Sequence, residues 1–241
     1  MRGLFRLIWA FAWRVALVLG IVTAGATGYY LTILPPSAEL FDGRGTGSVI
    51  LRDVNGEIFA WRGEQYGGDI RADRVSPHLV NAVLAAEDKR FYMHPGLDPQ
   101  GIARALMVNI RAGRIVQGGS TITQQVAKLL YLNAERTIER KLKEVPIALA
   151  LELKYTKEEI LSVYMNRVYL GAGTHGFEAA AQRYFGKSAR VVSPAEAAML
   201  AGLLRAPSRY APTNDLAQAQ GRASVIVRLM EAQGFLTEAE A

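Results

Sequence analysis

The sequence contains no cysteine among its 241 residues, and it contains only three histidines. The missing thiols exclude structural disulfides, cysteine-ligated zinc, iron–sulfur clusters and a cysteine nucleophile. The histidines, His78, His94 and His175, do not have the spacing of zinc ligands. A disulfide-stapled scaffold and a zinc site are therefore excluded, whereas the cellular compartment stays open.

The composition has no strong bias either. Half of the residues are hydrophobic and 21% are charged, which excludes a wholly disordered or collagen-like chain. The net charge is +6, and three of the positive charges, on Arg2, Arg6 and Arg14, precede the first long apolar run. The remaining excess is mild, so nucleic acid is not an expected partner. The length fits one medium domain with an appendage.

One apolar run is long enough to cross a membrane. Val15 to Leu34 contains no charged residue, and a helix of that length spans about 30 Å. Pro35 and Pro36 end it, and the basic residues before it place the N-terminus in the cytoplasm. The alternative is a cleaved signal peptide with Ala24-Gly25-Ala26 as a weak cleavage site. The length of the run favours a retained anchor.

The rest of the chain predicts a linker and one mostly α domain. We expect residues 1–34 to form the tip and anchor, residues 35–47 a linker, and residues 48–241 the folded domain. Two β-type runs, Ser48–Val54 and Glu57–Trp61, flank Asn55-Gly56 and predict a hairpin.

Helix signals follow the hairpin. N-cap residues before proline occur at Ser76 and Asp98, and capping boxes begin at Thr156 and Ser193. These signals predict at least six helices. The sequence contains no internal repeat. Further signals concern helix ends: Gly113 and Gly171 are expected stops, and Pro146 should kink or interrupt a helix over Glu135–Tyr155.

The helix that begins after Ser76 carries two acids in its last turn. Its apolar face comprises Leu79, Val80, Val83 and Leu84, and Glu87 and Asp88 follow. An acid near a helix C-terminus faces the negative end of the dipole, so a desolvated one has a raised pKa and suits proton abstraction. The alternative is a pair of surface acids neutralised by Lys89 and Arg90.

A glycine-flexed turn at Gly118-Gly119 leads into a helix that starts with hydroxyl and amide side chains. Its free N–H groups suit a phosphate or a sugar, although a simple capped helix start has the same pattern. Cations follow, and these form either ordinary surface pairs with Glu144 or a site for a polyanionic leaving group. The cations are Lys128, Arg136, Arg140, Lys141 and Lys143.

Five segments in this order resemble the peptidoglycan glycosyltransferases, glycosyltransferase family 51. They are residues 87–96, 119–125, 140–144, 160–166 and 205–210, and the resemblance extends from residue 48 to about 236. It implies a mainly α, lysozyme-like fold with a small β-hairpin, a preceding transmembrane helix and an apolar jaw near the membrane. Candidates for the jaw surface, which could instead be ordinary core, are Leu106, Met107, Ile110, Ile115 and Val116.

The resemblance also implies roles. Lipid II is the acceptor and the growing lipid-linked glycan is the donor; Glu87 deprotonates the acceptor's 4-hydroxyl, and Glu144 with neighbouring cations stabilises the leaving pyrophosphate. No tightly bound cofactor is expected, but Mg²⁺ or Mn²⁺ is, with Glu144 as its ligand. The substrate-binding set that the resemblance implies comprises Asp88, Phe91, His94, Arg104, Ser120, Thr121, Gln124, Gln125, Lys128, Arg136, Arg140 and Lys141.

Two other functions fit parts of this pattern. A lysozyme-like lytic transglycosylase needs one acid and no pyrophosphate site, and an envelope scaffold needs neither. The family also includes bifunctional class A penicillin-binding proteins, but the sequence has no Ser-x-x-Lys, Ser-x-Asn or Lys-Thr-Gly motif of a transpeptidase. The expected location is the bacterial inner membrane, with the domain on its outer side and cell-wall synthesis proteins as partners.

Overall fold

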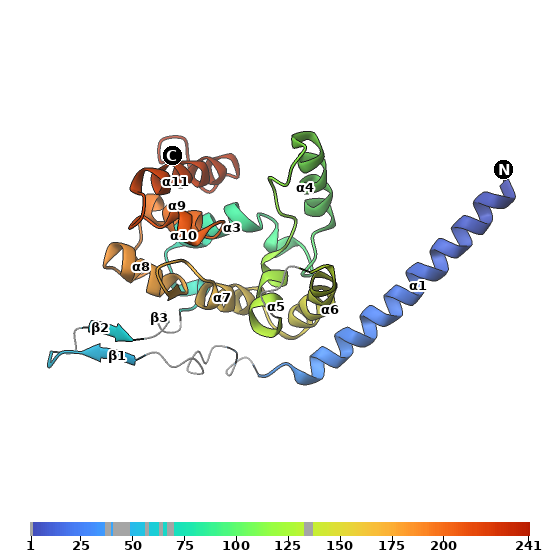
Figure 1. The fold of residues 1–241 in the computed structure, drawn as a ribbon, viewed down its shortest axis with the longest axis horizontal. Coiled ribbons are helices and arrows are strands. Elements are labelled where there is room, and N and C mark those ends of the chain that lie inside the picture. The colour runs from blue at the N-terminus through green and yellow to red at the C-terminus, as the bar shows by residue number, and fades with distance from the viewer. Residues whose placement is uncertain are drawn as a thin grey trace.

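The computed structural model describes residues 2–36, 40, 49–55, 58–62, 65–66, 70–132 and 137–241 (Figure 1). The helices are α1 (Arg2–Ile33), α3 (Pro77–Glu87), α4 (Pro99–Ala112), α5 (Ile122–Tyr131), α6 (Ile138–Lys154), α7 (Lys157–Arg167), α8 (Phe177–Phe185), α9 (Pro194–Leu203), α10 (Pro207–Tyr210) and α11 (Leu216–Ala232). The strands are β1 (Val49–Arg52), β2 (Ile58–Arg62), β3 (Gln65–Tyr66) and β4 (Thr174–His175), and short 3₁₀ turns cover Ala72–Arg74 and Phe91–Met93. The predicted mainly α class is confirmed.

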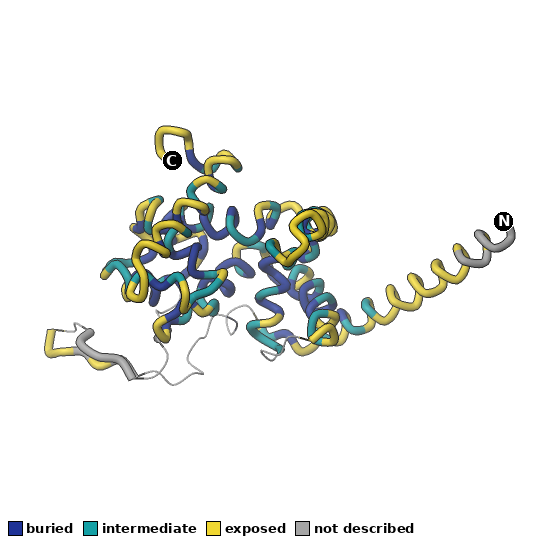
Figure 2. The backbone as a smooth tube through the Cα atoms, turned by 45° about the horizontal axis from the view of Figure 1, so that its top comes forward, coloured by how far each residue is buried: buried dark blue, intermediate teal, exposed yellow. Residues whose placement is uncertain are grey.

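Helix α1 contains the predicted apolar span. Trp9–Ile33 is long and apolar enough to cross a membrane by length and composition, and most of its residues are exposed (Figure 2). The end of α1 lies against α6, where Lys154 Nζ donates to the Leu34 carbonyl at 2.5 Å. Tyr155 donates from its hydroxyl to the Pro35 carbonyl, also at 2.5 Å. The span is thus attached to the domain through its last turn.

The predicted hairpin is confirmed. β1 and β2 pair antiparallel, with Ile50 opposite Trp61 in the register. Asp53 Oδ1 accepts from the Asn55 N–H at 2.9 Å, which is the local turn contact expected of an Asp two residues before Asn. Ser48, Gly56, Glu57 and most of the expected linker lie outside the described residues. β3 and β4 add a two-residue parallel pairing that the sequence did not predict.

The core forms where three helices meet. α3 packs against α9 and α11, and Leu79, Val83, Leu200 and Ile226 are buried there. α5 packs between α6 and α7. In Figure 1, α8 to α11 lie to the left and α4 to α6 to the right, and Figure 2 shows buried segments inside both groups. α4 projects from the body and buries only Ala105.

Most predicted caps are present. Asp98, Thr156 and Ser193 accept from backbone N–H groups of α4, α7 and α9, and the last two form complete capping boxes. Ser76 precedes α3 as predicted, but its hydroxyl donates to the Val192 carbonyl at 2.9 Å instead of capping the helix. Gly113 ends α4 in the left-handed region, at φ 62°, as predicted.

The expected helix stop at Gly171 is wrong, and of the two effects expected of Pro146, a kink or an interruption, the interruption does not occur. α7 ends at Arg167, and Gly171 lies beyond it in the next turn, at φ 86°. Pro146 does not interrupt its helix, because α6 runs from Ile138 through Lys154. The carbonyl that proline leaves unpaired belongs to Leu142, and this residue is 67% exposed, so water can satisfy that carbonyl.

Candidate active site

Glu87 lies at the end of α3 and faces α5. Its carboxylate accepts a hydrogen bond from Gln125 Nε2 at 2.8 Å, and Gln125 Oε1 accepts from the Tyr164 hydroxyl at 3.3 Å. Burial raises the pKa of Glu87, the Gln125 hydrogen bond and the charge of Arg222 lower it in part, and the nearby Asp88 raises it again. The net direction is upward, so Glu87 is a better proton acceptor than an exposed glutamate.

Asp88, next to Glu87, is buried and only 6% exposed. His94 Nε2 lies 3.0 Å from each of its carboxylate oxygens, and the Ile122 N–H donates to it at 3.0 Å. The alternative of a surface acid paired with Lys89 or Arg90 is therefore wrong for Asp88. Asp88 instead ties the end of α3 to the first turn of α5. Arg90 pairs with Asp98, the cap of α4.

A second cluster joins α5's leading turn to α6. Lys141 Nζ donates to Ser120 Oγ at 2.7 Å and also pairs with Glu144, which pairs with Arg140 as well. Glu144 is only 3% exposed. The predicted pairs within the helix are thus present, but they surround a buried carboxylate instead of forming a solvated face. Lys143 lies apart from this cluster and pairs with Glu139 at 2.6 Å.

Thr121 and Gln124 act on the backbone. They form a complete capping box at the start of α5, and the Thr121 hydroxyl also donates to the Gly96 carbonyl at 2.6 Å. The capping interpretation is therefore confirmed for this helix start. Gly119 allows the turn to approach α4, since a Cβ there would come 3.2 Å from the Ile102 Cα.

The other candidate residues divide by burial. Phe91 is fully buried, with Lys157 Nζ 4.4 Å from its ring centroid, and His94 is buried beside Asp88. These two side chains support the site from inside. Arg104 on α4 is partly buried and Lys128 on α5 is exposed, and neither has an ion-pair partner in the described part of the chain. The candidate Arg136 lies outside the described residues.

The described residues do not form a divalent-cation site on their own. They contain no group of three His, Asp or Glu side chains that could hold a metal ion. Both carboxylate oxygens of Glu144 already bind cations, one to Arg140 and the other to Lys141. Its surroundings are those of a carboxylate that orients two cations, and we therefore assign no step to a metal.

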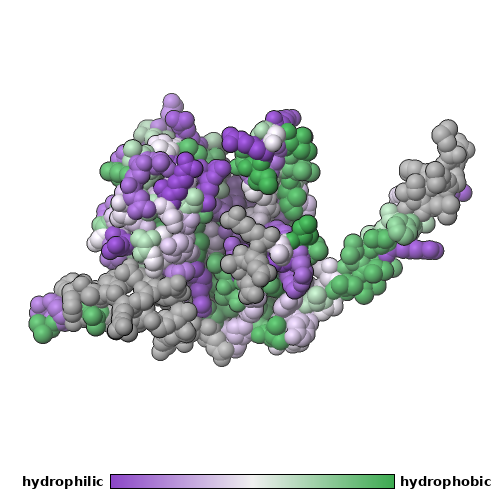
Figure 3. Space-filling model, in the orientation of Figure 1, coloured by the Kyte–Doolittle hydropathy of each residue, from purple (hydrophilic) through white to green (hydrophobic). Residues whose placement is uncertain are grey.

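An apolar stripe runs along the outer side of α4. Leu106, Met107 and Ile110 are 58%, 57% and 70% exposed, and Ile115 in the following turn is 88% exposed. Figure 3 shows this side of α4 as hydrophobic. These four candidates for the jaw surface are thus not core residues. Val116, the fifth candidate, is partly buried.

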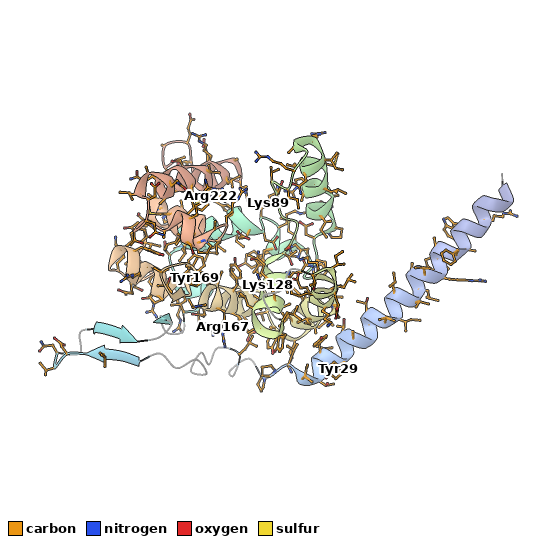
Figure 4. All side chains as sticks on the ribbon, viewed as in Figure 1. Tyr29, Lys89, Lys128, Arg167, Tyr169 and Arg222 are labelled. Atoms are coloured by element: carbon orange, nitrogen blue, oxygen red, sulfur yellow. The ribbon has the colours of Figure 1, made fainter. Side chains whose placement is uncertain are left out.

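Arg222 on α11 is a site residue that the sequence did not indicate. Its charge lowers the pKa of Glu87, although the two residues are far apart in the chain. Figure 4 labels Arg222, Lys89 and Lys128, which come from α11, the end of α3 and α5 around the middle of the molecule. Arg222 lies outside all five segments of the family resemblance, so no local signal could identify it.

Comparison with known proteins shows the family to which the chain belongs. The profile of a family described as Transglycosylase matches residues 55–231, which include Glu87 and Glu144. The chain therefore belongs to the transglycosylase family. This confirms the resemblance to peptidoglycan glycosyltransferases found in the five segments.

The relatives it resembles are penicillin-binding proteins 1A. The chain is 42% identical over 226 residues to the one from Aquifex aeolicus, covering 91% of this chain and 31% of the relative. It is 42% identical over 205 residues to the one from Escherichia coli K12, covering 85% and 24%. A crystal structure of penicillin-binding protein 1A from Haemophilus influenzae aligns at a TM-score of 0.45 with 21% identity, covering 81% of this chain and 20% of that one. The chain thus spans about a quarter to a third of the length of these two curated relatives.

Proposed function

We propose that this chain is a membrane-anchored peptidoglycan glycosyltransferase that polymerises lipid II into glycan strands and releases undecaprenyl pyrophosphate. The observation that carries the proposal is the double contact of α5. Gln125 on α5 binds Glu87, and Ser120, just before α5, binds the Lys141–Glu144 pair. The first turns of α5 therefore contact both Glu87, the candidate base, and the cations around Glu144. A glycosyl transfer from a pyrophosphate donor requires a base and a cation cluster near each other.

In this mechanism Glu87 takes the proton from the 4-hydroxyl of the acceptor lipid II. The hydroxyl oxygen attacks the anomeric carbon of the donor, a new glycosidic bond forms with inversion, and the bond to the pyrophosphate breaks. The pyrophosphate leaves with the bonding electron pair, and Arg140, Lys141 and Lys128 stabilise its charge. No general acid is needed for departure, because a pyrophosphate is already a good leaving group. A glycoside hydrolase, by contrast, must protonate a poor one.

Glu144 has a supporting role in this proposal. A buried carboxylate holding Arg140 and Lys141 fixes the direction of both cations before substrate arrives. Such preorganisation stabilises developing charge without reorganisation during the reaction. The expected Mg²⁺ or Mn²⁺ would have to take most of its ligands from the pyrophosphate and from water, since the described residues offer no ligand set of their own.

The membrane is the proposed location of the substrate and of the anchor. α1 would cross the inner membrane with its N-terminus in the cytoplasm, and the domain would lie on the outer side. The exposed stripe of α4 would enter the lipid, beside the lipid-linked substrates. The attachment of Leu34 and Pro35 to α6 would keep the domain close to the bilayer surface.

Incubation of the detergent-solubilised chain with labelled lipid II tests the proposal. We expect a ladder of glycan polymers and equimolar release of undecaprenyl pyrophosphate for each bond formed. The same chain is then incubated with purified cell wall. Release of soluble muropeptides without consumption of lipid II would identify a lytic transglycosylase, and the absence of both reactions would favour a scaffold.

A further inference from the structure

A second group of cations lies on α10, on α11 and in the turn before α10, and α11 packs against α3, the helix that ends at Glu87. An open pocket of about 540 Å³ lies between α10 and α11, and Arg209, Tyr210, Gln218 and Arg222 are among its lining residues. The Arg209 guanidinium lies 5.6 Å from the Tyr210 ring centroid, and its Nε donates to Gln218 Oε1 at 3.0 Å. The pocket wall is thus built from oriented side chains.

Arg222 is held in this wall by close packing. A Cβ on Gly202 of α9 would come 3.0 Å from the Arg222 Cγ, so the glycine provides the room for the arginine stem. The Nε of Arg222 is buried and has no hydrogen-bond partner in the part of the chain that the structure describes. A buried guanidinium N–H without an acceptor is costly unless a ligand satisfies it.

The positive charges here lie near one another, and Glu87 is the one carboxylate in the described ranges that raises the pKa of Arg222. Arg205 is close enough to Arg222 to lower its pKa, in addition to the larger lowering by burial. None of Arg205, Arg209 and Arg222 has an ion-pair partner among the described residues. The one acid in the pocket wall, Asp215, accepts instead from the N–H and side-chain amide of Gln218. The cations of the first cluster, by contrast, share the carboxylate of Glu144.

The geometry of the proposed reaction indicates which substrate lies near this second group of cations. In an inverting transfer the attacking hydroxyl and the leaving group lie on opposite faces of the donor sugar. If the leaving pyrophosphate lies at Arg140 and Lys141, the body of the acceptor extends from Glu87 in the other direction. Arg222 lies on α11, which packs against α3 and lies across the molecule from α6 (Figure 1), and its charge lowers the pKa of Glu87.

We propose that Arg205, Arg209 and Arg222 bind an oxyanion of the acceptor lipid II, either its pyrophosphate or a carboxylate of its stem peptide. The proposal rests on the proposed function. Both groups suit the planar donors of arginine, which bind carboxylate and phosphate oxygens in pairs. The site would hold the acceptor in register while its 4-hydroxyl meets Glu87.

The test separates donor from acceptor. The donor is a lipid-linked glycan whose terminal 4-hydroxyl is blocked, and the acceptor is lipid II; the initial rate of coupling is measured while each is varied. We expect the full chain with Arg205→Gln and Arg222→Gln to show an acceptor KM raised about 10–100-fold, the range for loss of charge-assisted contacts. The donor KM should change less than about twofold.

Two controls keep the test decisive. Arg228→Gln removes the same charge from an exposed position of the same helix and should leave both KM values unchanged. Arg205→Gln alone, at an exposed position, repeats the test if the double variant melts at a lower temperature. An unchanged acceptor KM, an equal rise in the donor KM, or an equal effect of Arg228→Gln would overturn the proposal.

A second acceptor substrate distinguishes the two possible sources of the oxyanion. With lipid II that lacks its stem peptide, a retained KM effect assigns the pyrophosphate, and a lost effect assigns the peptide carboxylate. Failure of the wild-type chain to couple donor and acceptor at all would reject the proposed function, and this site with it. A working wild type with unaffected variants would reject this site alone.

Discussion

Helices α3 and α4 both begin with a proline after a predicted cap residue, yet their apolar faces have different environments. Leu79 and Val83 on α3 are fully buried against α9 and α11. Met107 and Ile110 on α4 are exposed by more than half, and among the described residues of α4 only Ala105 is buried. The residues at a helix start therefore predict the helix, but they do not predict whether its apolar face packs against protein or stays exposed.

The comparison suggests that α3 and α4 have different roles. The packed helix α3 holds Glu87 in a fixed, desolvated position, as a general base requires. The projecting helix α4 has an apolar surface that no described residue covers, as a lipid-facing element requires. Substitutions in α3 should therefore lower the rate of the reaction or the stability of the fold, whereas substitutions in α4 should lower activity on membrane-bound substrate.

The largest expected effect follows from changing the end of α3. Glu87→Gln keeps the shape of the side chain but removes its ability to accept a proton. We expect the rate of lipid II polymerisation to fall about 10²–10⁴-fold, the usual contribution of a general base, with an unchanged melting temperature. Glu231→Gln, at an exposed position of α11, is the control. Near-wild-type turnover of the Glu87 variant would remove Glu87 from the mechanism.

The next effect contrasts the two apolar faces directly. Leu79→Ala on α3 should lower the free energy of unfolding by about 2–5 kcal/mol, because it leaves a cavity in a packed core. Ile110→Ala on α4 should change it by less than about 0.5 kcal/mol, because no packing is lost. Thermal melts of the full chain in detergent measure both. Equal destabilisation would show that the face of α4 is packed against protein.

The smallest effect concerns the membrane alone. Ile110→Asn should lower polymerisation of lipid II in vesicles by about tenfold, the effect of losing one buried aliphatic side chain. It should leave the rate on a short-chain, water-soluble lipid II unchanged. Val191→Asn is a matched control, since Val191 is 67% exposed on another part of the domain. A loss on both substrates would contradict a role for α4 in lipid contact.

The features that the sequence predicted are local ones. The hairpin, the caps of α4, α7 and α9, and the pairs within α6 each depend on residues a few positions apart. The sequence also indicated Glu87, through its place in a helix and through the family resemblance. A twenty-residue uncharged run likewise needs no tertiary information to be identified as a candidate span.

Other features depend on contacts between distant segments. The family resemblance implies that Asp88 and His94 bind substrate, but their side chains contact each other, and Asp88 also accepts from the backbone of α5. Arg222 acts on Glu87 from a helix near the other end of the chain. The continuity of α6 through Pro146 depends on which carbonyl is exposed, and sequence alone does not give this.

The central claim is that Glu87 is the general base and that its desolvated position adjusts its pKa. The most direct test is the pH dependence of kcat/KM for lipid II in the wild type and in Glu87→Gln. Because the base must be deprotonated and burial raises its pKa above the usual value of 4.5, wild-type activity should fall at acidic pH with a midpoint above that value. The residual activity of Glu87→Gln should be flat over the same range. An acidic decline with the same midpoint in the variant would contradict the claim.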